Sequence, residues 1–405
     1  MGSFSRSNSA TPSVPCPNEC GAAKAENDAL VARTQQRADG ILAESNLAAH
    51  PPMCRLQAPE MKARADRYNR YSDALPGARA AQDMNKLGDQ RENESPVTQP
   101  CLTRLPLDAD ALNRELGIDP NSPGAIKPSD LEDRTTGYRA AMYRDEATGR
   151  NILVARDTDP SSLVDWKTNI ENGAGIQTDQ YKSISELSRK LHQNGVPFDA
   201  AGYSKGGGLA QQAGLMSPDS NVYVFNSAGL NDNSLQWAGQ SSFDSLTSRT
   251  RAFSAEGDFL TFMNETTDPE LQVVNANYLR GQLRGENAGV ISPMKIRYES
   301  PANMAKDSQA FINNRDQFLQ ELDGYIDSGS ISFPPVRAAS REDIPNSMSN
   351  LSRMMGGNSD QPRMGKLNQH KIDNVVGPDA AHPGPMENQM AEDLQAMEAF
   401  KQQCG

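Results

Sequence analysis

The chain contains 405 residues with a formal net charge of −12, and apolar residues make up 36% of it. This length suggests two or three domains and allows one large buried core. Acidic side chains number 52 against 40 basic ones, which argues against nucleic acid as the main partner.

The sequence holds no apolar stretch of the roughly eighteen residues that a membrane-spanning helix needs. Residues 1–20 also lack the apolar run of a secretory signal peptide. Any export is therefore expected to use a route that reads no such signal.

Residues 1–105 are predicted to form a helical N-terminal segment. Aliphatic side chains recur at roughly helical spacing in residues 25–50, with a helix cap expected near Asn27. A second helix is predicted over residues 58–75, ending near Pro76. Because aliphatic side chains are sparse here, we expect these helices to pack on the core, a partner or a secretion carrier.

The cysteines are Cys16, Cys20, Cys54, Cys101 and Cys404. Four of them precede the predicted core, so we expect them not to fasten it. Cys16 and Cys20 have the spacing of half a zinc site, but no matching pair of Cys or His lies nearby. We favour free thiols, or disulfides formed after export, over a zinc site.

The core is predicted to occupy residues 106–300, where strands alternate with helices. Two strands joined by a turn are followed by an amphipathic helix, a short strand, a helix and two further strands. Their ranges are 137–145, 150–158, 179–195, 198–202, 205–216, 221–230 and 249–258. Such alternation predicts parallel crossover units. The fold class is therefore α/β, a mostly parallel sheet with helices on both faces.

Residues 301–405 are predicted to form a helical C-terminal extension. Helical spacing extends over residues 303–326, and a connection rich in proline, serine and methionine runs from about 328 to 366. A short tail rich in methionine, glutamate and glutamine closes the sequence.

One serine stands out in the stretch FDAAGYSKGGGLAQQAGLM, where Ser204 lies inside a Gly-x-Ser-x-Gly frame. A serine hydroxyl is a weak nucleophile unless a base takes its proton. One known arrangement places the serine on a sharp turn between a strand and a helix, with glycines that permit the strained backbone. Because a predicted strand precedes Ser204 and a predicted helix follows it, we interpret Ser204 as a nucleophile. The alternative is a tight turn whose serine only caps the helix.

Residues from about 150 to 265 resemble the lipase class 3 branch of the α/β-hydrolases. The family's Arg-Gly-Thr/Ser stretch corresponds to residues 156–158, its Asp-Trp pair to residues 165–166, and its serine elbow to residues 202–210. The chain departs from the family pattern at Asp157 for glycine, Tyr203 for histidine and Lys205 for leucine. It is also similar to bacterial antibacterial phospholipase effectors of contact-dependent, type VI-like secretion systems. The resemblance implies an α/β-hydrolase-like sheet.

A catalytic histidine is expected after the serine and the acid in chain order. We favour His370, because three apolar residues within 372–376 would anchor its segment, although an exposed tail position is the alternative. His382, on a proline-flanked loop, is the alternate base. His50 and His192 precede the serine, and we interpret His192 as a surface residue at a helix end.

Asp258 is the predicted triad acid, because it follows a strand at the edge where sites form in open α/β sheets. The resembling family places its aspartate at the corresponding point, and its role would be to orient the imidazole. Asp232 is the alternate acid, and a simple turn position is the alternative for Asp258. The backbone N–H of Lys205 and the family position at Thr158 are the expected oxyanion donors. A carboxylate at Asp157 would oppose the developing negative charge unless it points away.

The predicted function is a lipase-type serine esterase that cleaves acyl esters of membrane phospholipids, without a metal or organic cofactor. The resemblance to antibacterial effectors implies a cognate immunity protein, a possible secretion carrier, and action in the periplasm or at the membrane of a target cell. A cytoplasmic location is the alternative. A hydrolase of soluble esters or thioesters and a non-catalytic interaction protein stay open as other functions. Five apolar residues either screen the pocket and meet lipid or pack in the core: Leu235, Trp237, Phe243, Val273 and Val274.

Overall fold

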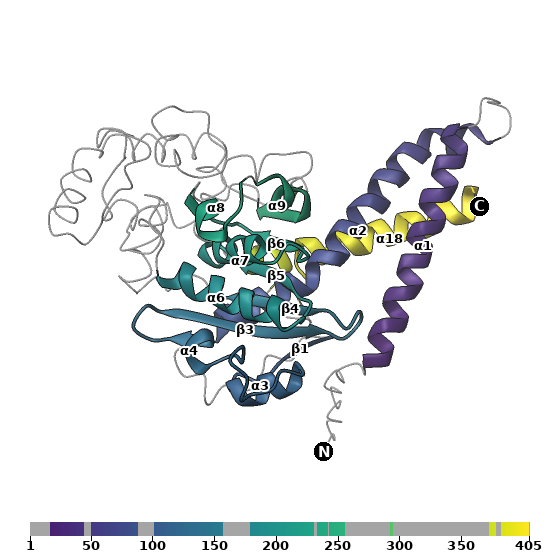
Figure 1. The fold of residues 1–405 in the computed structure, drawn as a ribbon. Helices are drawn as coiled ribbons and strands as arrows, with labels where there is room; N and C mark the ends of the chain where they lie inside the picture. Colours follow the sequence, from purple (N-terminus) through teal and green to yellow (C-terminus); the bar gives the residue numbers. More distant parts are fainter. Residues whose placement is uncertain are drawn as a thin grey trace, which may run out of the picture.

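The computed structural model describes residues 17–43, 50–87, 101–156, 179–230, 233–241, 243–255, 292–294, 372–377 and 382–404. Figure 1 shows a central sheet with helices packed around it and a helical arm that leaves it on one side. The strands are β1 (Leu102–Arg104), β2 (Glu132–Asp133), β3 (Tyr138–Asp145), β4 (Asn151–Ala155), β5 (Asp199–Tyr203), β6 (Val222–Phe225), β7 (Thr250–Ala255) and β8 (Ser292–Met294). The helices are α1 (Pro17–Ala43), α2 (Pro52–Lys86), α3 (Ala109–Glu115), α4 (Pro128–Leu131), α6 (Asp179–Gln193), α7 (Lys205–Met216), α8 (Asn233–Ala238), α9 (Asp244–Arg249), α17 (Asp373–Val376) and α18 (Pro385–Cys404).

The sheet has the strand order β1-β3-β4-β5-β6-β7-β8, with β2 pairing beside β3. β3 pairs antiparallel with β1, β2 and β4. Each pairing from β4 to β8 is parallel. Among the described strands, β3 alone therefore runs against the rest, and the prediction of a mostly parallel α/β sheet is confirmed.

Both faces of the sheet are buried, because successive side chains of a strand point to opposite faces. Ala200 and Val224 join an apolar cluster with residues of α3, α6 and α7 on one face. Ala201 and Phe225 join a cluster with residues of α2 and α17 on the other face. This two-sided burial explains why the central strands read as continuous apolar runs rather than alternating ones.

Helix α2 is longer than the sequence predicts, since it does not end near Pro76 but continues to Lys86. A methyl group on the next residue, Gly77, would lie 2.9 Å from the Cβ of Ala201, so the helix lies directly on β5 at this point. Burial of the alanine-rich second half of α2 on the sheet compensates for the backbone hydrogen bond that proline removes. The predicted cap near Asn27 is also wrong, because α1 already begins at Pro17.

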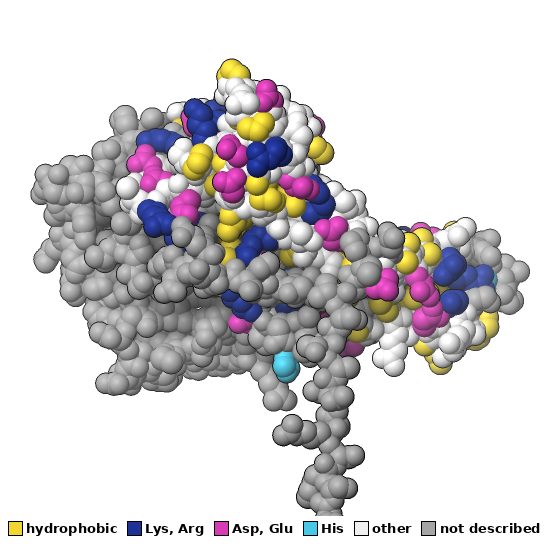
Figure 2. All heavy atoms as spheres, turned by 90° about the horizontal axis from the view of Figure 1, so that it is seen from below, with side chains coloured by type: hydrophobic (Ala, Val, Ile, Leu, Met, Phe, Trp, Pro, Cys, Tyr) yellow, Lys and Arg dark blue, Asp and Glu magenta, His cyan; other side chains and the backbone are white. Residues whose placement is uncertain are grey.

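The arm consists of α1, the first half of α2, and α18 (Figure 1). Its centre contains Asp393, whose side chain is fully buried. Oxygen atoms of this carboxylate accept from Arg67 Nε at 2.8 Å and from Arg64 Nη1 at 3.0 Å. The hydrogen bond to Asp393 raises the pKa of Arg67. Figure 2 shows acidic and basic side chains next to one another on the outer surface of the arm.

Two disulfides fasten the arm, which corrects the expectation that the cysteines leave the core untouched. Cys20 of α1 is bonded to Cys101, the residue before edge strand β1. Cys54 near the start of α2 is bonded to Cys404 at the end of α18, across a sequence separation of 350. Cys20 precedes the predicted core in the sequence but is therefore fastened to the edge of the sheet in space. The sulfur of Cys20 is also not available to a zinc ion.

The apolar residues around α8 belong to the core rather than to a lipid-facing screen. Leu235 and Trp237 pack against the cluster that contains α6 and α7, and Phe243 is buried in it. Val273, Val274, the helix predicted over 303–326 and the connection after it lie outside the described residues.

Candidate active site

Ser204 lies on the turn that joins β5 to α7, with φ 53° and ψ −123°. Residues other than glycine rarely adopt this backbone conformation, because it costs about 1–3 kcal/mol. The exceptions cluster at functional sites. The strand, turn and helix occur in the predicted order. The local geometry is therefore that of a strained strand-to-helix turn rather than an ordinary helix cap, and Ser204 makes no side-chain cap hydrogen bond to α7.

The two frame glycines are required by close backbone contacts. A methyl group on Gly202 would lie 2.0 Å from the carbonyl oxygen of Gly206. One on Gly206 would lie 2.5 Å from the carbonyl oxygen of Ala155, at the end of β4. The first turn of α7 thus packs directly on two neighbouring strands, and any side chain at either position would displace the helix.

Hydrogen bonds from the β6 side hold the strained turn. The N–H of Ser204 donates to Phe225 O at 3.0 Å, and the N–H of Ala228 donates to Ser204 O at 2.9 Å. The amide of Gln211 on α7 donates to Ala228 O at 2.9 Å and to Ser227 Oγ at 3.1 Å. Gln211 therefore links the helix to the loop that braces the serine. Sequence reasoning missed it, because glutamine is ordinarily exposed and only the packing of α7 shows the exception.

The surroundings of Ser204 exclude water and favour a negative charge. Ser204 is 4% exposed, and it precedes the first turn of α7, where backbone N–H groups and the helix dipole present partial positive charge. Electrostatic interactions strengthen where water is excluded. Such a position suits an anionic intermediate.

Two of the four histidines are placed far from Ser204. His50 precedes α2 at the outer end of the arm, and about 25 residues of helix, roughly 37 Å, separate it from the contact at Gly77. His192 is exposed near the end of α6, which leads into the amino end of β5, whereas Ser204 follows its carboxyl end. The prediction of a surface position for His192 is confirmed, and neither residue suits the role of base.

The other candidate residues are only partly described. His382 is exposed, in the turn between α17 and α18. Asp258, His370, Thr158 and Asp232 lie outside the described residues, as does Asp157. Of the predicted site residues, Ser204, Lys205 and His382 are therefore described, and Ser204 and Lys205 are adjacent in the sequence.

The segment that follows residue 370 returns to the sheet. Val375 and Val376 of α17 are fully buried in the cluster that contains Tyr203, Phe225 and Phe253. Tyr203 ends β5 and Phe225 ends β6, so this anchor lies at the carboxyl ends of the strands on the α2 face. The predicted anchoring role of these apolar residues has a structural basis.

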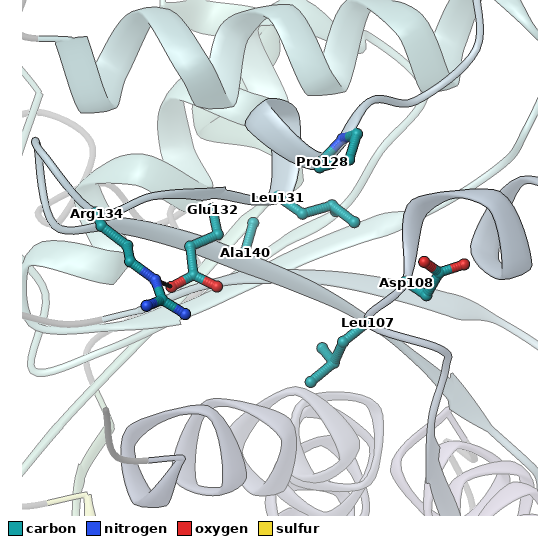
Figure 3. Close-up of a pocket in the computed structure, with 7 residues that line it drawn as sticks. All are labelled: Leu107, Asp108, Pro128, Leu131, Glu132, Arg134 and Ala140. Carbon is teal, nitrogen blue, oxygen red and sulfur yellow. Dashed lines mark hydrogen bonds and ion pairs between the residues drawn. The ribbon is translucent and has the colours of Figure 1, made fainter. Parts of the chain in front are cut away.

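A cavity of about 650 Å³ lies elsewhere, beside β3 (Figure 3). Its lining includes Leu131, Ala140 and Leu107, and none of its lining residues comes from β5 or α7. Its charges are already engaged, since Glu132 accepts from Arg134 and Asp108 accepts from the first turn of α3. This cavity is therefore separate from the serine site.

Comparison with known families identifies the central part of the chain. Residues 110–307, just under half of the sequence, match the family model of the Tle-like phospholipase domain. Over these residues the chain is similar to Tle-like phospholipase domains. The matched region contains Ser204 and the sheet from β2 to β8, and it ends before His370. No curated protein gives a match to the chain.

The match supports an ester hydrolase activity for this part of the chain. Phospholipids are the substrate class that the description of the matched family model names. The helices that the structure describes include none with the length and apolar character to cross a bilayer. Within the same ranges, no three His, Cys, Asp or Glu side chains gather as a metal site would require.

Proposed function

We propose that the phospholipase domain is a serine esterase in which Ser204 attacks the acyl carbonyl of a membrane phospholipid. The observation that carries this proposal is the backbone of Ser204, with φ 53° between β5 and α7. α/β-Hydrolases hold their nucleophile on such a turn. The N-terminus of α7 beside it supports stabilisation of the tetrahedral oxyanion, with the N–H of Lys205 as one donor and Thr158 supplying the other.

His370 is proposed as the base that takes the proton of Ser204 and returns it to the leaving alcohol. Burial of Ile372, the second residue after it, in the cluster beside β5 and β6 supports this assignment. Asp258, the third residue after the end of β7, is proposed to orient the imidazole. His382 and Asp232 are the alternates.

The protein is further proposed to be a secreted antibacterial effector of a type VI-like system, with a cognate immunity protein and a secretion carrier as partners. Two disulfides support action in an oxidising compartment such as the periplasm, because cytosolic thiols are kept reduced. Expression directed to the periplasm is therefore expected to be toxic, and expression in the cytoplasm much less so. Equal harmlessness in both compartments would contradict this role.

The catalytic assignment is tested with Ser204→Ala, which is expected to abolish hydrolysis of phospholipid vesicles and leave the melting temperature nearly unchanged. Ser188→Ala is the matched control, since Ser188 is a buried serine of α6 whose hydroxyl donates to Ile184 O. Turnover retained by Ser204→Ala would refute the nucleophile. Of His370→Ala and His382→Ala, only replacement of the true base is expected to lower kcat/KM by several orders of magnitude.

A further inference from the structure

Gln211 is a fully buried polar residue of α7, the helix that follows the serine turn. Its amide nitrogen donates to Ala228 O at 2.9 Å, to Ser227 Oγ at 3.1 Å and, at the longer distance of 3.4 Å, to Gly207 O. Because Ala228 O and Gly207 O can only accept, these contacts determine which end of the amide is the nitrogen. The donating end of Gln211 therefore points to the loop that follows β6.

This loop, residues 226–228, holds the peptide of the serine. The N–H of Ala228 donates to Ser204 O at 2.9 Å, and the hydroxyl of Ser227 donates to Ala228 O at 2.6 Å. The loop begins at Asn226, which has a positive φ of 43°, as Ser204 has one of 53°. Each such conformation costs about 1–3 kcal/mol and persists only where surrounding contacts enforce it. The loop therefore joins two strained residues at the carboxyl ends of neighbouring strands.

Close packing brings the loop against α7. A methyl group on Gly207 would lie 2.1 Å from Ser227 Oγ, so a side chain at this position would displace the loop. Gln211 follows four residues later on the same face of the helix, and its longer side chain reaches the next loop residue, Ala228. A continuous chain of hydrogen bonds thus runs from Gln211 to Ala228 and from Ala228 to Ser204.

We propose that Gln211 is a positioning residue of the serine site, which acts on Ser204 through Ala228. This inference rests on the proposed role of Ser204. The glutamine fixes the Ala228 peptide, and the N–H of that peptide holds the carbonyl group of Ser204 in its strained conformation. Without the amide, the loop is free to shift and the serine backbone relaxes. Misplacement of a reacting group by about 1 Å can cost about 10²-fold in rate.

Gln212, the next residue of α7, provides a matched control. It is equally buried, but its amide donates to Ser185 Oγ of α6 instead of the loop. Gln211→Met and Gln212→Met each replace one buried amide by an apolar side chain of similar size in the full chain. The readouts are the melting temperature, the second-order rate at which a fluorophosphonate labels Ser204, and kcat and KM for a soluble short-chain phospholipid.

Both variants are expected to lower the melting temperature by similar amounts, because each loses buried hydrogen bonds. Gln211→Met alone is expected to slow labelling by about tenfold or more, and to lower kcat with little change in KM. Hydrogen exchange of the amides in residues 226–228, measured by mass spectrometry, is expected to be faster in Gln211→Met than in Gln212→Met. Such a combination distinguishes positioning of the serine from a general loss of stability.

Equal labelling rates for the folded Gln211→Met and Gln212→Met variants would overturn the proposal. Unchanged hydrogen exchange in the loop of Gln211→Met would also overturn it, because the effect would then not pass through Ala228. If Gln211→Met does not fold, Gln211→Leu takes its place. Failure of both variants to fold would make Gln211 a structural residue alone and would contradict the positioning role.

The same measurements separate this inference from the assignment of Ser204. Absence of labelling in folded wild-type protein, or hydrolysis retained by Ser204→Ala, would refute the nucleophile, and the positioning role would fall with it. A labelled wild type beside a Gln211→Met variant that is labelled equally fast would refute the positioning role and leave the nucleophile in place.

Discussion

Removal of the disulfide between Cys54 and Cys404 is expected to weaken the whole fold, although the bond lies at the outer part of the arm. The bond joins the start of α2 to the end of α18. α2 continues from there onto the sheet, and α18 follows the turn after α17. Cys54→Ser opens the link and keeps a small polar side chain in place.

The magnitude follows from the loop that the bond closes. In the chain-entropy relation, a separation of 350 residues corresponds to about 6 kcal/mol, and the separation of 81 for Cys20 and Cys101 to about 4.5 kcal/mol. Domains are stable by about 5–15 kcal/mol, so either loss is a large share of the total. The native contacts of Asp393 and its arginines remain, so the loss arises from the greater freedom of the unfolded chain.

Urea unfolding followed by circular dichroism, without reductant, measures this loss. Cys16→Ser is the control, because Cys16 takes part in neither described bond. We expect the free energy of unfolding to fall by several kcal/mol for Cys54→Ser and to stay unchanged for Cys16→Ser. Added reductant is expected to destabilise the wild type further than Cys54→Ser alone, since it also opens the second bond. Superimposable curves for wild type and Cys54→Ser would refute the reasoning.

Two further perturbations test the serine turn and the edge of the sheet. Gly206→Ala is expected to lower the free energy of unfolding by about 1–3 kcal/mol or more and to abolish hydrolysis, because the added methyl would lie 2.5 Å from a strand carbonyl oxygen. Gly40→Ala is the control, because Gly40 lies in α1 with nothing within 4 Å of the added methyl, and its free energy of unfolding is expected to rise by about 1 kcal/mol. Equal melting temperatures for the two variants would contradict the packing argument. Hydrogen bonds from Thr135 lower the pKa of Asp133 below its ordinary value of 3.8. The ionised carboxylate of Asp133 therefore stabilises the fold above pH 3.8, and this stabilisation is lost as the pH falls through the lowered pKa. Asp133→Asn is therefore expected to melt below the wild type at pH 7 and to converge with it in strong acid, whereas a gap that is independent of pH would count against this account.

Elements whose signals are local were predicted well from the sequence. The hairpin of β3 and β4, helix α6 with its stop at Gly195, and the succession of β5 and α7 all occur where the residue pattern indicated them. Their signals are apolar runs, amphipathic spacing and glycines, which act over a few residues. The length of α2 was missed, because the penalty at Pro76 is local whereas the burial that offsets it comes from the sheet.

The candidate site, like the fold, could be predicted only in part from the sequence. The Gly-x-Ser-x-Gly frame indicated the turn at Ser204, and contacts at both glycines explain why. Gln211 and the buried side chain of Lys205 were not foreseen, because lysine and glutamine are ordinarily exposed and only packing shows the exception.

The sequence by itself determined a strained strand-to-helix turn carrying Ser204, since glycine spacing and flanking apolar runs impose that conformation within a dozen residues. Only the tertiary structure decided which cysteines meet, where α2 and α17 lie on the sheet, and which charged side chains are enclosed. Those outcomes depend on the burial of residues up to hundreds of positions apart, and the free energy of such contacts is set by the packed core as a whole.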